Sequence, residues 1–165
     1  MRGSAVRRFV PWGSVTVGAL WGLIAALAFL ALGGFYGGIA MLSDPSGAAL
    51  GMDTVLPLLP VADYTLPGVF LVLVMGVAPL LAAFGLLVRP RWARTDAVER
   101  LSGHSLAWTA ALALGLVLTV WLVVQGALIG FRWPIQYVTA VNAALILALT
   151  LAPSVRHACR RRVRA

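Results

Sequence analysis

The sequence predicts an all-α protein, a transmembrane four-helix bundle that forms a single integral membrane domain over residues 1–165. Four long apolar stretches support this prediction, because a helix needs ~20 apolar residues to cross a hydrocarbon core. Hydrophobic residues make up 61% of the chain and charged residues 11%, which excludes a disordered chain. No soluble domain of this length could bury so much apolar sequence. The spans are expected at residues 14–42, 67–88, 104–129 and 135–151.

The distribution of arginine predicts the membrane topology of the bundle. All thirteen basic residues are arginines, and twelve of them fall before span 1, between spans 2 and 3, or after span 4. The loop between spans 1 and 2 has no basic residue and contains Asp44, Asp53 and Asp63. The positive-inside rule therefore places both termini in the cytoplasm, as an even number of spans also requires. The absence of lysine is typical of a GC-rich bacterial genome, so we expect the inner (plasma) membrane of a bacterium.

Span 1 is longer than a straight crossing requires and carries the pairs Gly33-Gly34 and Gly37-Gly38. It must therefore tilt, kink at the glycines or project beyond the membrane. The loop that follows, Ser43–Leu66, is rich in apolar residues and holds three prolines. We expect it to form an ordered outer lid, held over the hairpin of spans 3 and 4 by an ion pair from Arg132 to Asp44 or Asp63.

Span 2 begins at Thr65, a plausible helix cap, with Pro67 in the first turn, where proline costs little. Pro79 lies inside the span and cannot donate a hydrogen bond to the Met75 carbonyl. We expect the span to bend near Met75–Pro79, with that carbonyl facing the bundle interior.

Span 3 is expected to begin after Ser102 as its cap, and a short turn at Gly130–Pro134 joins it to span 4 as a helical hairpin. Small residues recur every four positions and predict where helices approach one another closely. They are Gly18, Gly22 and Ala26 in span 1, Ala107, Ala111 and Gly115 in span 3, and Ala140, Ala144, Ala148 and Ala152 in span 4.

Polar groups within the membrane fall at one depth, about 9–18 Å from the outer span ends at ~1.5 Å per residue. One interpretation is helix packing, in which the amide of Asn142 satisfies the free Met75 carbonyl. The other is a small ligand pocket beneath the lid. Its lining would be Tyr36, Met75, Trp121, Gln125, Gln136 and Asn142.

The basic cytoplasmic tail, residues 153–165, is expected to bind anionic lipid headgroups, with on the order of 1 kcal/mol from each charge. The arginines assigned to this role are Arg156, Arg160, Arg161 and Arg162. No aromatic interleaving accompanies them, so no nucleic-acid partner is expected.

No cofactor, metal site or catalytic residue is predicted. Cys159 is the only cysteine, which excludes an internal disulfide and a thiolate metal cluster. The spacing of the three aspartates in the first loop matches no known cation-binding loop. His104 and Ser105 begin a helix and have no third partner, so they are read as part of its cap.

Three segments carry a resemblance: residues 41–52 (MLSDPSGAALGM), 63–68 (DYTLPG) and 121–125 (WLVVQ). The pattern resembles uncharacterised small four-span bacterial membrane proteins, and the general architecture is similar to the DoxX-like group. This resemblance implies no activity and assigns no role to any residue.

We expect a non-enzymatic inner-membrane protein that binds a small apolar ligand or lipid, or that serves as a subunit of a larger membrane complex. A homo-oligomer is one possible assembly. One alternative is a lipid isomerase of the EXPERA type, although no span contains the carboxylates it would need. Another is a small oligomeric transporter or pore, which usually keeps charged residues inside its spans. A closed apolar cavity would favour binding, a carboxylate drawn into the bundle would favour an enzyme, and a continuous water-filled path would favour transport.

Overall fold

The computed structural model describes residues 14–88 and 103–160, and these residues fold as helices joined by short loops. Four helical segments are long and apolar enough to cross a membrane: Val15–Ser43, Thr65–Val88, Leu106–Ile129 and Pro134–Leu151. The all-helical class is therefore confirmed, and so are four helices long and apolar enough to span a membrane, each boundary within two residues of its expected position.

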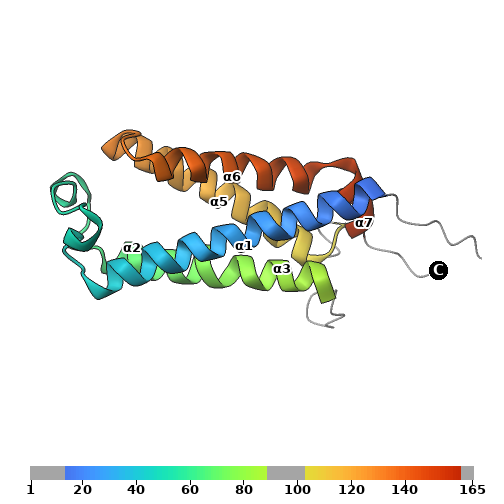
Figure 1. The fold of residues 1–165 in the computed structure, drawn as a ribbon, viewed down its shortest axis with the longest axis horizontal. Coiled ribbons are helices and arrows are strands. Elements are labelled where there is room, and N and C mark those ends of the chain that lie inside the picture. The colour runs from blue at the N-terminus through green and yellow to red at the C-terminus, as the bar shows by residue number, and fades with distance from the viewer. Residues whose placement is uncertain (1–13, 89–102, 161–165) are drawn as a thin grey trace, which may run out of the picture.

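The elements are labelled as in Figure 1. The first span is α1, and the second is built from three successive segments, α2, the π-helix η3 and α3. The third span is α5, the fourth is α6, and a short helix, α7, follows. The bounds are α1 Ser14–Ser43, η1 Ala48–Leu50, η2 Leu56–Leu58, α2 Thr65–Phe70, η3 Leu71–Val77, α3 Ala78–Val88, α5 Leu106–Ile129, α6 Pro134–Leu151 and α7 Pro153–Cys159.

The bundle has two different ends, which Figure 1 shows at the left and right of the view. The first, here called the loop end, carries the segment from Asp44 to Tyr64 and the turn between α5 and α6. The second, the α7 end, carries the start of α1 and the helix α7, which contact each other. Between them α1 runs obliquely, packing on α2 and η3 near the loop end and on α6 and α7 near the other.

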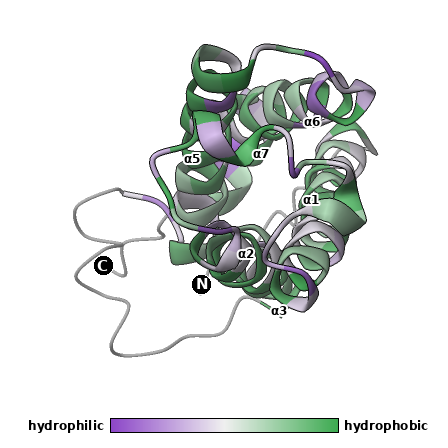
Figure 2. Cartoon of the chain, turned by 90° about the vertical axis from the view of Figure 1, so that its left-hand side faces the viewer, coloured by the Kyte–Doolittle hydropathy of each residue, from purple (hydrophilic) through white to green (hydrophobic). Residues whose placement is uncertain are grey.

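Large apolar side chains cover the outside of the bundle. Among the most exposed are Leu32 at 70%, Val141 at 69% and Val120 at 62%. Figure 2 shows the same pattern, with green hydrophobic helices and most of the purple in the connecting segments. An exterior this apolar suits a lipid environment, in which every backbone polar group must be satisfied within the protein.

The closest approach between helices lies where α1 crosses η3, at Gly34 and Gly38. A Cβ atom added to Gly34 would lie 2.5 Å from the Met75 carbonyl oxygen, and one added to Gly38 would lie 2.8 Å from the Gly68 oxygen. Only glycine leaves room for backbone-to-backbone contact at both positions. The second glycine of each pair therefore lies at the helix crossing.

The small-residue stripes predict some contacts and miss others. In α5, Gly115 packs on Leu147 and Ile146 of α6 as expected. At the start of α1, however, Gly18 has no atom within 4 Å of an added Cβ, so that part of the stripe faces outward. Ala144 and Ala148 of α6 are exposed as well. A stripe of small residues shows which contacts are sterically allowed, and the larger side chains around it decide which ones form.

Proline in the second span is accommodated by the π-helix η3, which ends two residues before Pro79. In this segment a backbone N–H donates to the carbonyl five residues earlier instead of four, as in the bond from the Ala78 N–H to the Leu73 carbonyl. Such turns adjust the backbone where the regular pattern is interrupted. The Met75 carbonyl lies against Gly34 of α1, so it faces another helix rather than lipid.

We predict that Gly34→Ala destabilises the bundle by about 1–3 kcal/mol, because the added methyl group overlaps the η3 backbone. The measurement is the thermal unfolding midpoint of the detergent-solubilised protein. The matched control is Gly33→Ala, where an added Cβ meets nothing within 4 Å. Equal midpoints for the two variants would contradict the proposed contact.

Candidate functional site

An apolar groove lies between α2 and α5, with a volume of about 320 Å³. Four aliphatic side chains of α5 and two aromatic rings form its walls. Positions 116, 120 and 124 lie one helical turn apart, as do 117 and 121, so two adjacent rows of α5 line it. The lining residues are Phe70, Leu116, Val117, Val120, Trp121 and Val124.

A ring stack forms one wall of this groove. The rings of Phe70 and Trp121 lie with their centroids 4.9 Å apart and an interplanar angle of 28°, an offset arrangement worth ~0.5–1.5 kcal/mol beyond burial. Within the described residues the Trp121 indole N–H has no hydrogen-bond partner. The groove therefore combines an aromatic wall with one polar donor.

The packing interpretation of Asn142 is wrong in its choice of partner. The side-chain amide of Asn142 is buried and donates to the Ala26 carbonyl of α1 at 3.2 Å. The Met75 carbonyl instead lies against Gly34. The amide thus joins α6 to α1, because α1 crosses obliquely and presents its middle to α6 and its second half to η3.

Gln136 stabilises the turn between α5 and α6. Its oxygen accepts from the backbone N–H groups of Arg132 at 2.9 Å and Trp133 at 3.1 Å, and its amide donates to the Gly130 carbonyl at 3.1 Å. These bonds occupy both lone pairs of its oxygen and one of its two N–H donors, so the side chain is committed to the turn. Gln125 is half-buried on α5 and does not line the groove.

The six residues expected to line one pocket are therefore not gathered. Tyr36 is 75% exposed on the outside of α1, whereas Met75 is buried in the core. Of the six, only Trp121 lines the groove. The sequence predicts how deep each of these side chains lies along the bundle axis. It does not predict the helix face on which each side chain lies.

The predicted lid pairing is not formed. No ion pair joins the exposed Arg132 to Asp44 or Asp63, all three of which are described. The Asp44 carboxylate accepts from the Ser46 hydroxyl at 2.6 Å and the Ala49 N–H at 2.8 Å, and Asp63 accepts from the Thr65 N–H at 2.8 Å. Local backbone donors satisfy both carboxylates, so neither needs the distant guanidinium.

The segment from Asp44 to Tyr64 instead folds on itself around the Tyr64 ring. This side chain is almost fully buried, and its hydroxyl donates to the Met52 carbonyl at 2.9 Å. Gly47, at φ 79°, packs under the ring where a Cβ would overlap it. Val55 is buried in the same unit while Leu58 is exposed. The contacts that hold this segment are therefore internal ones rather than an ion pair to Arg132.

The two titratable groups that hold this loop respond to pH in opposite directions. The Ser46 hydroxyl and then the Ala49 N–H lower the pKa of Asp44 below 3.8, so its contribution is present above that pH and lost as the pH falls through the folded value. Burial, and secondarily the Asp53 charge, raise the pKa of Tyr64 above 10.0. Its contribution is present below pH 10 and lost as the pH rises further.

At the α7 end, Arg156 and Arg160 are exposed, while Arg161 and Arg162 lie outside the described residues. Ser105 caps α5 by accepting from the Trp108 N–H, which corrects the expected cap at Ser102. His104 stacks on Trp108 with ring centroids 4.2 Å apart. In the described part of the chain no three His, Cys, Asp or Glu side chains are close enough to hold a metal ion.

Comparison with known proteins gives no match to a protein-family model, a curated protein or a solved structure. The groove and the two ends of the bundle are therefore the features from which a function can be inferred.

We predict that Tyr64→Phe loosens the loop, because the Met52 carbonyl loses one of its two donors and keeps only the Val55 N–H. A net hydrogen bond of ~0.5–1.5 kcal/mol corresponds to roughly 2- to 10-fold faster local opening. Limited proteolysis between residues 44 and 64 measures this rate. Tyr36→Phe is the matched control, since that hydroxyl lies on the outside of α1. A Tyr64→Phe cleavage rate equal to wild type would mean that this bond does not hold the loop.

Proposed function

We propose that this chain is a multi-pass inner-membrane protein that binds a lipid-like apolar molecule in the groove between α2 and α5. The single observation that carries the proposal is the apolar hollow beside the Phe70–Trp121 stack. Its volume of about 320 Å³ lies at the lower end of the ~300–1,000 Å³ typical of ligand pockets. It is open along one side, so a ligand would enter laterally from the bilayer.

The lining also supports a particular chemistry for the ligand. All six lining side chains are apolar or aromatic, so the part of the ligand that they contact is uncharged. The Trp121 indole N–H would provide one hydrogen bond, suited to an ester or carbonyl oxygen of a lipid. Along α5, residues 124 to 116 lie about 8–20 Å from the loop end at ~1.5 Å per residue, the depth of an acyl chain in one leaflet.

We predict that Val120→Trp fills the groove and reduces ligand capture several-fold. The protein is reconstituted with a phospholipid whose acyl chain carries a photoreactive diazirine, and the labelled peptides are identified by mass spectrometry. Wild type should be labelled on the segments around Phe70 and residues 116–124, above the labelling of other lipid-facing surfaces. Displacement of the label from these segments by excess unlabelled lipid would show that the site saturates.

The matched control is Val123→Trp, which adds the same volume to an exposed position of α5 outside the groove. It should leave the labelling unchanged. If the two tryptophan variants label equally, or if wild type labels evenly around the bundle, the groove is only ordinary lipid-facing surface. A subunit of a larger membrane complex would then be the better interpretation.

The proposal includes cytoplasmic termini, for which the support is the twelve-to-one distribution of arginine. With this threading, the loop end and the groove lie on the outer side of the bilayer.

We predict that an impermeant thiol reagent labels Asp53→Cys in intact cells and labels His157→Cys only after the membrane is permeabilised. Both variants are made in a Cys159→Ala background, and both positions are exposed in the structure. The reverse pattern would mean that both termini are outside and would move the groove to the inner leaflet.

A further inference from the structure

The helix α7 forms a fixed platform across the end of the bundle. The Ser105 N–H donates to the Cys159 carbonyl at 2.8 Å, and His104 and Arg160 form an isolated backbone bridge. On its inner side Val155 and Cys159 are buried. The start of α5 and the end of α7 are therefore held together, and the side chains on the outer side of α7 have a defined position.

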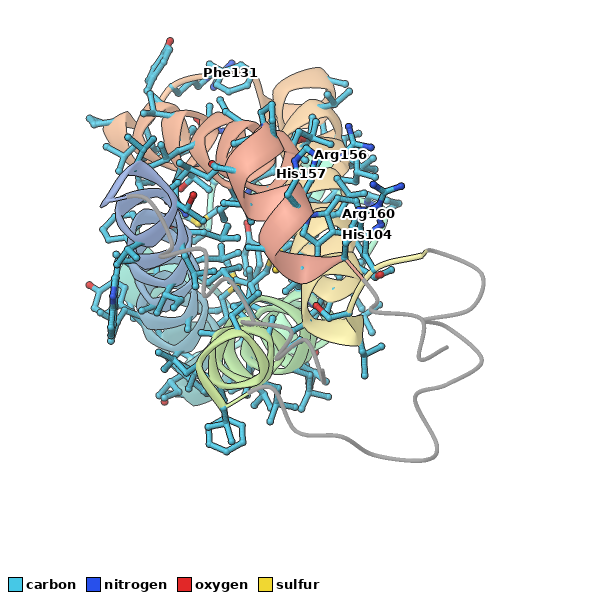
Figure 3. The ribbon with its side chains drawn as sticks, turned by 90° about the vertical axis from the view of Figure 1, so that its right-hand side faces the viewer. His104, Phe131, Arg156, His157 and Arg160 are labelled. Carbon is cyan, nitrogen blue, oxygen red and sulfur yellow. The ribbon has the colours of Figure 1, made fainter. Side chains whose placement is uncertain are left out.

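That outer side is basic. Figure 3 shows Arg156 and Arg160 close together with His104 beside them. Both arginines are exposed: Arg156 lies in the last turn of α7, and Arg160 is the extended residue that caps it, fixed by its backbone bridge to His104. The nearby start of α5 adds partial positive charge from the helix dipole. The described aspartates, Asp44, Asp53 and Asp63, all lie at the opposite end.

His157 does not belong to the charged pair. Its ring nitrogen Nδ1 donates to the Pro153 carbonyl of its own helix. The proposal therefore rests on the two guanidinium groups, whose positive charges attract a phosphate group.

The surroundings of the pair favour a lipid phosphate over a soluble one. Arg156 follows the end of α6 by five residues, beyond the break at Ala152, and α7 carries it across the end of the bundle next to the span ends. Leu106 and Leu151, at the ends of the adjoining spans, are exposed at 39% and 48%. A ligand at this edge would thus meet cations on one side and lipid-facing apolar side chains on the other.

We propose that Arg156 and Arg160 form a preorganised site for the phosphate of an anionic phospholipid at the α7 end. The site lies at the opposite end from the groove and does not depend on it. The site is preorganised because the backbone that carries both arginines is already fixed before the lipid arrives.

The test uses the full-length protein in bilayers of phosphatidylcholine that contain a small fraction of spin-labelled phosphatidylglycerol or spin-labelled phosphatidylcholine. The immobilised fraction of each label gives the preference for the anionic lipid. Arg156→Gln/Arg160→Gln should reduce this preference roughly 5- to 30-fold, since each cation near the surface contributes about a fivefold factor. Arg156→Lys/Arg160→Lys, which keeps the charge, should retain most of it.

The matched control is Arg132→Gln, which removes an exposed arginine at the loop end and should leave the preference at the wild-type value. Millimolar inorganic phosphate should not displace the labelled phosphatidylglycerol. Unchanged preference in the double glutamine variant would overturn the proposal. An equal loss in Arg132→Gln, a loss in the double lysine variant, or displacement by inorganic phosphate would do so as well.

Discussion

The contact between Gly34 and Gly38 of α1 and the backbone of α2 and η3 is the constraint on which the rest of the bundle depends. In lipid there is no hydrophobic driving force between helices, so close packing must hold them together. Here the two backbones meet because no side chain separates them. The position of this crossing turns the first half of α1 toward α6, where Gly22 packs on Leu149 and Asn142 bonds to the Ala26 carbonyl.

The buried polar groups act as links between elements, with one exception. The Trp108 indole N–H donates to the Thr150 carbonyl at 2.8 Å and joins α5 to α6. Gln136 similarly satisfies the turn between these two helices. In the described residues the Thr150 hydroxyl is the one buried side-chain group without a partner. Polar groups used in this way leave an apolar interior, so the space available to a ligand lies between spans, on the lipid-facing side.

Much of the fold could be predicted from the sequence, because membrane spans follow from local composition. The position of side chains around the helix axes could not. Gly18 and Gly34 both belong to regularly spaced small residues, but only Gly34 lies at a crossing. The Asn142 amide donates to the Ala26 carbonyl and not to the Met75 carbonyl, because the oblique course of α1 brings Ala26 next to α6. The aliphatic lining of the groove, such as Val120, has the same sequence pattern as any lipid-facing surface, so only Trp121 could be anticipated.

The way α5 is held explains why a groove can open beside it without cost to the fold. Toward α6, Gly115 packs on Leu147, and toward α3, Ala107 packs on Gly85. These contacts are tight and cannot separate without exposing backbone to lipid. Toward α2, by contrast, α5 meets Phe70 through the side-chain stack with Trp121. Two rings can shift by rotamer changes while both backbones stay in place. An apolar ligand entering on this side would exchange one aromatic contact for another, so the α2–α5 seam is where the bundle can adapt to what it binds.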